Sequence, residues 1–166
     1  IYISSAEHPD LKKRIQLYLN HYFGFVPKIH MIDHQLCHLA SAYYPSNFDN
    51  AMILSIDGMG DFKSMTTAKG VNGKITVLNT KDISQSLGIF YQTMTQYIGF
   101  SGLGDEYKFM GLSAAGSKKI NLDKIIKVGR YDYKINDKFL KRKPIYRNFF
   151  EPRYGKELVR LYGKPR

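Results

Sequence analysis

The amino-acid sequence predicts an α/β fold in which a mixed sheet is flanked by helices. Short apolar runs, typical of strands, alternate with longer segments whose apolar residues recur at helical spacing. A hairpin over residues 62–80 interrupts this alternation, so the pattern is not a pure series of βαβ units. The 166 residues suffice for one domain or for two small lobes that share a core.

The chain begins with a predicted strand and helix. IYIS at residues 1–4 is typical of a short strand, and HPDLKKRIQLYLNHYFG at 8–24 has the spacing of a helix that ends at Gly24. The apolar face of this helix is predicted to contain Leu11, Ile15, Tyr18, Leu19 and Tyr22.

A second strand and helix follow. FVPKIHMI at 25–32 is expected to form a strand, and Asp33 is suited to cap the next helix. That helix should end near Tyr44, because Pro45 disfavours its continuation.

Three strands are predicted in the middle of the chain. AMILSID at 51–57 fits a buried strand that GMGD at 58–61 should end. The segments at 62–70 and 74–80 form a hairpin, because the Asn72-Gly73 pair supplies the positive φ angles of a tight turn.

The remaining elements are more helical. We expect helices at 86–100, around 106–114, at 119–129 and from about Glu151, with a strand at 131–136.

Composition favours a folded cytoplasmic protein. The single Cys37 cannot form a disulfide within the chain, as is usual in a reducing compartment. No apolar run approaches the roughly 18–20 residues of a membrane span, so no membrane partner is expected. Because the chain begins with Ile1, we expect it to be a piece of a longer protein.

The net charge of +11 is confined to residues 118–166, which hold 16 Lys and Arg against five Asp and Glu. Lys and Arg interleaved with Tyr and Phe are compatible with RNA binding. They are equally compatible with an anionic small-molecule substrate or with ordinary solvated surface. The charge alone does not separate these interpretations.

His34 and His38 are candidate metal ligands, because residues four apart lie on one face of a helix. A zinc protease motif would need Glu beside the first histidine, and Gln35 stands there, so that class is excluded. Asp57, at the end of a buried strand, is the natural third ligand. An ordinary histidine pair and a plain Asp-Gly turn are the competing interpretation.

Two Gly-containing stretches are further candidates. Gly58 and Gly60 allow close approach of backbone N–H groups to a phosphate, and Thr66 offers a hydroxyl, although two glycines more often mean only a turn. Asp105, Glu106 and Lys108 lie in a Gly-rich stretch and are catalytic candidates by residue type alone; a solvated loop is the alternative.

Taken together, these stretches resemble a known family. The blocks DHQLCHLASAYYPSNFDNAMILSIDGMGD, SLGIFYQTMTQYIGF and GDEYKFMGLSAAG resemble the O-carbamoyltransferases of nodulation and antibiotic pathways. Their larger domain is similar to the tRNA threonylcarbamoyl transferases. The resemblance is strongest over residues 30–116, and LYGKPR at the end is also similar.

The resemblance implies the first lobe of an actin/hexokinase-like (ribonuclease H-like) fold, with residues 1–166 a partial domain and 118–166 its basic portion. It implies that carbamoyl phosphate and ATP form a carbamoyl-adenylate in a YrdC-like domain of the same chain. The carbamoyl group then moves to a hydroxyl of a sugar, aminoglycoside or similar acceptor. By the same resemblance His34, His38 and Asp57 hold a metal, usually iron, although zinc or manganese would suit these ligands.

Two other functions stay open at this stage. Threonylcarbamoyl transfer to tRNA would suit a basic tail, although the blocks after residue 86 resemble the small-molecule branch more closely. A non-enzymatic module that binds RNA through residues 118–166 is the third hypothesis, and nucleic acid is the less favoured partner.

Overall fold

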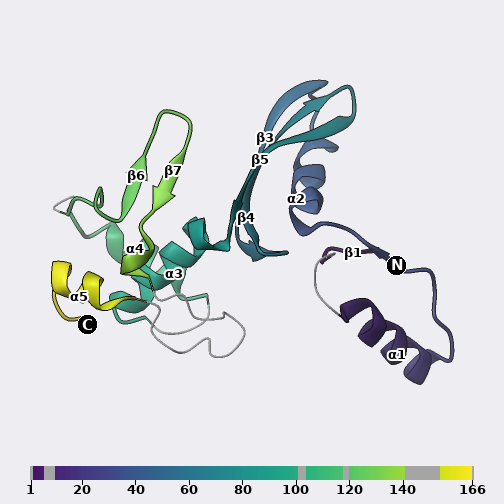
Figure 1. Ribbon diagram of the computed structural model, residues 1–166, viewed down its shortest axis with the longest axis horizontal. Coiled ribbons are helices and arrows are strands. Elements are labelled where there is room, and N and C mark those ends of the chain that lie inside the picture. Colours follow the sequence, from purple (N-terminus) through teal and green to yellow (C-terminus); the bar gives the residue numbers. More distant parts are fainter. Residues whose placement is uncertain (1, 6–9, 101–103, 118–119, 141–153, 166) are drawn as a thin grey trace. The chain divides into compact units, whose positions relative to one another are not determined.

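The computed structural model describes residues 2–5, 10–100, 104–117, 120–140 and 154–165 (Figure 1). Contacts divide the chain into two compact units, residues 1–83 and 84–166. Each unit combines helices with strands, so the mixed α/β class is confirmed.

The first unit contains two separate sheets. Strands β1 (Tyr2–Ile3) and β2 (His30–Met31) pair in parallel. Strands β3 (Asn50–Gly60), β4 (Lys63–Val71) and β5 (Lys74–Asp82) form an antiparallel sheet in the order β3-β4-β5. The prediction of one mixed sheet is therefore wrong for the described residues, because the parallel pair and the antiparallel strands share no ladder there.

Helix α2 (His34–Tyr43) covers one face of the antiparallel sheet and forms the core of this unit. Side chains on a strand alternate between its two faces, so every second residue of β3 and β4 points at the helix. The buried residues of this core are Leu39, Tyr43, Ile53 and Ala68. Asp33 caps the helix as expected, and the helix ends beside Tyr44.

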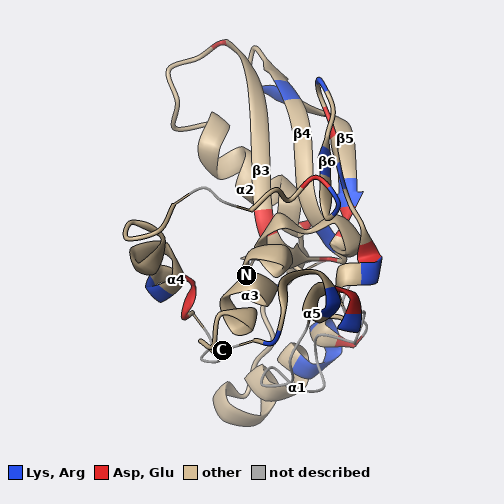
Figure 2. Ribbon diagram, turned by 90° about the vertical axis from the view of Figure 1, so that its left-hand side faces the viewer, with Lys and Arg blue, Asp and Glu red and all other residues tan. Residues whose placement is uncertain are grey.

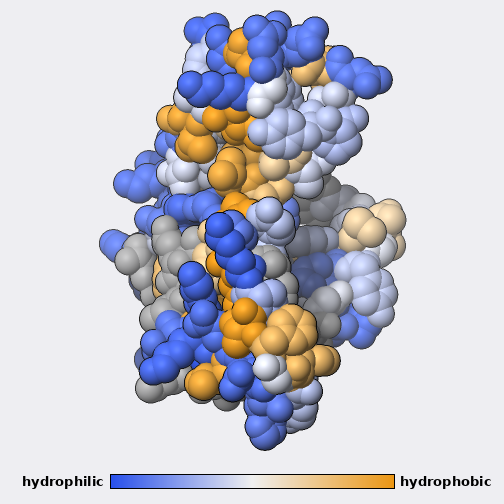
Figure 3. Space-filling view, turned by 90° about the vertical axis from the view of Figure 1, so that its right-hand side faces the viewer, coloured by the Kyte–Doolittle hydropathy of each residue, from blue (hydrophilic) through white to orange (hydrophobic). Residues whose placement is uncertain are grey.

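Helix α1 (Leu11–Phe23) ends at Gly24, as predicted, but buries none of its residues. Tyr18 and Tyr22 of the expected apolar face are 58% and 63% exposed. Figure 3 shows one face of the molecule, on which hydrophobic side chains lie among hydrophilic ones.

Two tight turns connect the antiparallel strands. Asn72 and Gly73 have φ angles of 47° and 79°, which confirms the predicted hairpin turn. Asp61 and Phe62 also have positive φ, at 49° and 59°, and connect β3 to β4. The strand predicted at 51–57 ends within residues 58–61 as expected, but β3 extends three residues beyond Asp57, through an irregularity after Ile56, and ends at Gly60.

The second unit contains helices α3 (Leu87–Tyr97), α4 (Glu106–Ser113) and α5 (Lys156–Tyr162) and the hairpin β6 (Ile126–Val128)–β7 (Tyr133–Ile135). Short 3-10 turns lie at Ile83–Gln85, at the junction of the two units, and at Asp137–Phe139. Lys and Arg recur along the hairpin (Figure 2). The expected start of the last helix at Glu151 lies outside the described residues.

The predicted helix at 119–129 is wrong. The Asn121 side chain accepts the N–H of Asp123 at 2.6 Å, which closes a local turn in place of a helical one. Ile126 then pairs with Ile135 across the hairpin, where its branched side chain fits a pleated strand well.

The core of the second unit joins α3 and α5 to the segments that flank the hairpin. Tyr97 lies in it and donates a 2.6 Å hydrogen bond to the carbonyl of Gly163. Burial, with the neighbouring Tyr154 and Tyr162, raises the pKa of Tyr97. The buried residues of this core are Tyr97, Ile125, Phe139 and Leu158.

Among the described residues, every helix is too short or too polar to cross a membrane.

Gly70→Ala is expected to lower the free energy of unfolding by about 1–3 kcal/mol through overpacking. A Cβ at Gly70 would lie 2.5 Å from Cε2 of Tyr43. That ring is fixed, because the Tyr43 hydroxyl donates to Asp49 and accepts from Gly73 N–H. Urea unfolding measures the effect, and a double-mutant cycle with Tyr43→Leu is the control. Fully additive losses would contradict the proposed clash.

Candidate metal centre

Two aspartates fix the first turn of α2. The Asp33 carboxylate accepts the N–H of Leu36 at 2.9 Å and pairs with the Lys63 ammonium of β4. Burial alone would raise the pKa of Asp33, but the hydrogen bonds from Lys63 and Leu36 outweigh it and the pKa lies below its usual value. The Asp61 carboxylate accepts the N–H of His34 at 2.9 Å. Since the N–H groups at a helix start lack partners within the helix, these bonds tie α2 to the β3–β4 hairpin.

The side chains of His34, His38 and Asp57 converge. The two rings have centroids 4.7 Å apart, one helical turn along α2. His34 Nε2 lies 2.9 Å from Asp57 Oδ2 and 3.0 Å from His38 Nε2, and His38 Nε2 lies 3.6 Å from Asp57 Oδ2. Asp57 reaches the histidines because it follows Ile53 and Ser55 at alternate positions of β3, on the face that α2 covers.

A backbone carbonyl sets the tautomer of His34. The carbonyl oxygen of Ser4 lies 3.1 Å from His34 Nδ1 and can only accept, so Nδ1 must donate. In the neutral ring, Nε2 then presents a lone pair to the carboxylate of Asp57 and to His38. Lone pairs and a negative oxygen repel each other unless a positive charge lies between them. A cation bound among these atoms would supply that charge.

The three residues fit a divalent ion. A tetrahedral ion with bonds of about 2.0–2.1 Å separates its donor atoms by roughly 3.3–3.4 Å. The observed separations of 2.9, 3.0 and 3.6 Å fall on both sides of that value. The side chains of His34, His38 and Asp57 are 27%, 48% and 28% exposed, so an ion there has positions open toward solvent. Two imidazoles and a carboxylate suit iron, zinc and manganese alike.

Gly58 and Gly60, near the end of β3, have different surroundings. A Cβ at Gly60 would lie 2.0 Å from Cδ2 of His34, so the ring occupies the space above this glycine. A Cβ at Gly58 would meet nothing within 4 Å, and its N–H donates to Asp57 Oδ1 at 2.6 Å. Thr66 is 2% exposed, with its hydroxyl 3.3 Å from that of Thr80. Phosphate contacts at Gly58, Gly60 and Thr66 stay a prediction, while Gly60 also has a packing role beside His34.

The other candidates lie in the second unit. Asp105 precedes α4 and forms a 2.6 Å ion pair with Lys108, and this hydrogen bond raises the pKa of Lys108. The backbone carbonyl of Glu106 accepts the hydroxyl of Tyr91 at 3.1 Å. A catalytic role for Asp105, Glu106 or Lys108 stays a prediction.

Three supporting residues were not identified from the sequence. In the sequence Asp61 is the last residue of DGMGD. Its position at the turn between two predicted strands is the signal that could have indicated a role in holding the start of helix α2. Ser4 acts through its backbone carbonyl, for which residue type gives no signal. Gln35 is 1% exposed, and its Oε1 accepts the Ser55 hydroxyl at 2.8 Å, which holds α2 on β3 between the two histidines.

Gly60→Ala is expected to weaken divalent metal binding at least about tenfold, because the His34 ring must move away from Asp57. Gly58→Ala is the matched control, since it adds the same methyl group two residues away in open space. Calorimetric titration of both variants with Co²⁺ or Zn²⁺ measures the affinity. Equal affinities would show that this packing does not position the ligand.

Comparison with known proteins shows the family of this chain. Residues 7–152 match the family described as carbamoyltransferase N-terminus. The chain is 42% identical over 89 residues to the nodulation protein NolNO of Sinorhizobium fredii. The matched segment is 54% of this chain and 13% of that protein. It is 39% identical over 85 residues to the nodulation protein NolO of Bradyrhizobium diazoefficiens, a segment that is 51% of this chain and 15% of that protein.

A third relative is archaeal. The uncharacterized protein MJ1058 of Methanocaldococcus jannaschii is 31% identical over 132 residues, which is 70% of this chain and 21% of the relative. The chain therefore spans only 13–21% of the length of the curated relatives that it matches. The family match covers most of the chain, including the two histidines and Asp57, and the chain belongs to the carbamoyltransferase family, in whose N-terminal region it lies.

Proposed function

We propose that the full-length protein transfers a carbamoyl group to a hydroxyl of a small-molecule acceptor, with ATP and carbamoyl phosphate as co-substrates. The convergence of His34, His38 and Asp57 within a carbamoyltransferase sequence is the observation that supports this function most directly. The carbamoyl donor in this proposal is a carbamoyl-adenylate, from which AMP leaves as the acceptor oxygen takes the carbamoyl group.

His34 Nε2, His38 Nε2 and Asp57 Oδ2 would hold the metal in this proposal. An ion bound there supplies Lewis-acid chemistry, because it offsets the negative charge of phosphate oxygens. The chain's own groups prepare the site: Ser4 fixes the His34 tautomer, and Asp61 fixes the His34 backbone. Iron is the metal that the resemblance favours.

The surroundings of Asp57 also support a proposal for the nucleotide contacts. Gly58 lies directly beside Asp57, and a Cβ placed there would meet nothing within 4 Å. We assign Gly58 and Gly60 to the phosphate side of the nucleotide, with Thr66 as a further candidate. As the general base for the acceptor hydroxyl we propose Asp105 or Glu106, and Lys108 stays a further catalytic candidate.

The architecture in this proposal is that of a partial actin-like domain. Residues 1–166 would supply part of its first lobe, and a YrdC-like domain elsewhere in the longer chain would make the carbamoyl-adenylate. The much greater length of the relatives leaves room for both. The similarity to two nodulation proteins favours a small-molecule acceptor over tRNA.

Replacement of both histidines, His34→Ala/His38→Ala, should reduce bound metal from about one equivalent to below a tenth, since one carboxylate alone holds a divalent ion weakly. Metal content of the purified full-length protein, by plasma mass spectrometry, measures this. His21→Ala, on exposed helix α1, is the matched control and should keep its metal.

Carbamoyl transfer by the same double variant should fall at least about a hundredfold, because the phosphate charge is no longer offset. The assay supplies ATP, carbamoyl phosphate and candidate sugars and follows AMP release and the carbamoylated product. Metal content equal to that of the wild type would contradict the ligand assignment. Transfer of a threonylcarbamoyl group to tRNA, in an assay that also supplies threonine and tRNA, without transfer to any small hydroxyl compound would contradict the acceptor class.

A further inference from the structure

The β6–β7 hairpin places two lysines directly opposite each other. In its register Lys127 pairs with Lys134, between the pairs Ile126–Ile135 and Val128–Tyr133. Like charges at directly opposed positions of an antiparallel pair destabilise it. Neither lysine has an ion-pair partner among the described residues. Both side chains are exposed, so solvent weakens this repulsion, but the register still places two positive charges side by side.

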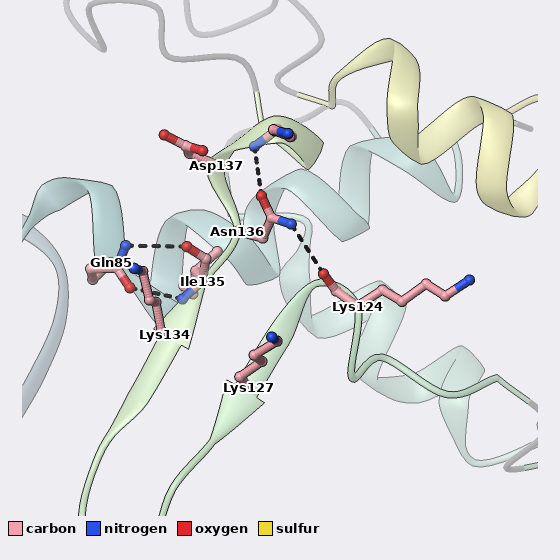
Figure 4. Close-up of a pocket in the computed structure, with 8 residues that line it drawn as sticks. Gln85, Lys124, Lys127, Lys134, Ile135, Asn136 and Asp137 are labelled. Carbon is pink, nitrogen blue, oxygen red and sulfur yellow. Dashed lines mark hydrogen bonds between the residues drawn. The ribbon is translucent and has the colours of Figure 1, made fainter.

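The two lysines line a pocket of about 520 Å³ in the second unit (Figure 4). Its volume falls within the range of about 300–1,000 Å³ that is typical of small-molecule sites. Lys124 and Lys138 also line it, and Asp137 is the one carboxylate among its lining residues. Positive charge therefore exceeds negative charge in a concave region, which concentrates anions there.

Hydrogen bonds keep one end of the pocket rigid. The Gln85 amide donates to the carbonyl of Ile135 at 3.2 Å and accepts its N–H at 2.7 Å. The Tyr133 hydroxyl donates to the carbonyl of Gln85 at 2.7 Å. Asn136 accepts the N–H of Lys138 at 3.2 Å. In Figure 4 Lys127 and Lys134 extend from neighbouring strands, with Lys134 beside Gln85 and Lys127 toward the side of Lys124.

We propose that this pocket binds a small molecule that carries a phosphate or diphosphate group. A phosphate between Lys127 and Lys134 would turn their repulsion into two charge-assisted hydrogen bonds. RNA is the less favoured ligand, because no aromatic side chain lines the pocket among the described residues, and single-stranded RNA is recognised mainly by stacking. The site lies wholly within residues 84–166, so it does not depend on the metal centre or on the proposed transferase activity.

The test compares binding of inorganic phosphate and pyrophosphate to the full chain by isothermal titration calorimetry at low salt. Lys127→Gln/Lys134→Gln should weaken pyrophosphate affinity at least tenfold, whereas Lys127→Arg/Lys134→Arg should keep it within about threefold. Lys12→Gln/Lys13→Gln, on the exposed face of α1, removes the same charge elsewhere and should leave the affinity unchanged.

Thermal unfolding provides a second measurement. Pyrophosphate should raise the midpoint of the wild type and of the arginine variant but not that of the glutamine variant. An equal loss of affinity in both glutamine variants would overturn the proposal in favour of a general charge effect. Tighter binding of a 12-nucleotide single-stranded RNA than of pyrophosphate, lost in Lys127→Gln/Lys134→Gln, would overturn it in favour of RNA.

Discussion

The attachment of helix α2 to the antiparallel sheet is the constraint on which the first unit depends. Leu39 and Tyr43 bury the C-terminal half of the helix against β3 and β4. At the other end, Asp33 and Asp61 hold its first turn against the hairpin. Because the helix is fixed at both ends, the backbone positions of His34 and His38 are set relative to Asp57.

The candidate metal centre results from this attachment. Asp57 is placed by strand alternation, while His34 is placed by the helix and by the absence of a side chain at Gly60. A carbonyl from Ser4, far away in the sequence, then fixes the ring tautomer. Three chain segments thus set one ligand, which is the kind of support that tunes metal affinity.

The sequence predicted most elements of this fold. The capping Asp33, the Asn72-Gly73 turn and the helix after Ser86 carry local signals, and all three were confirmed. The helix expected at 119–129 was wrong, because pairing of Ile126 with Ile135 overrides helical spacing. Local patterns could not reveal this competition, since the partner strand lies several residues further along the chain.

For the site, the sequence by itself determined the ligand types and the helical spacing of His34 and His38, because both are properties of a few adjacent residues. Its blocks also identified the family, which the comparisons confirmed. Only the tertiary structure decided that Asp57 meets the histidines and that Gly60 makes room for His34. It alone showed Lys127 opposite Lys134. Such contacts depend on strand register and helix packing, which no local sequence pattern specifies.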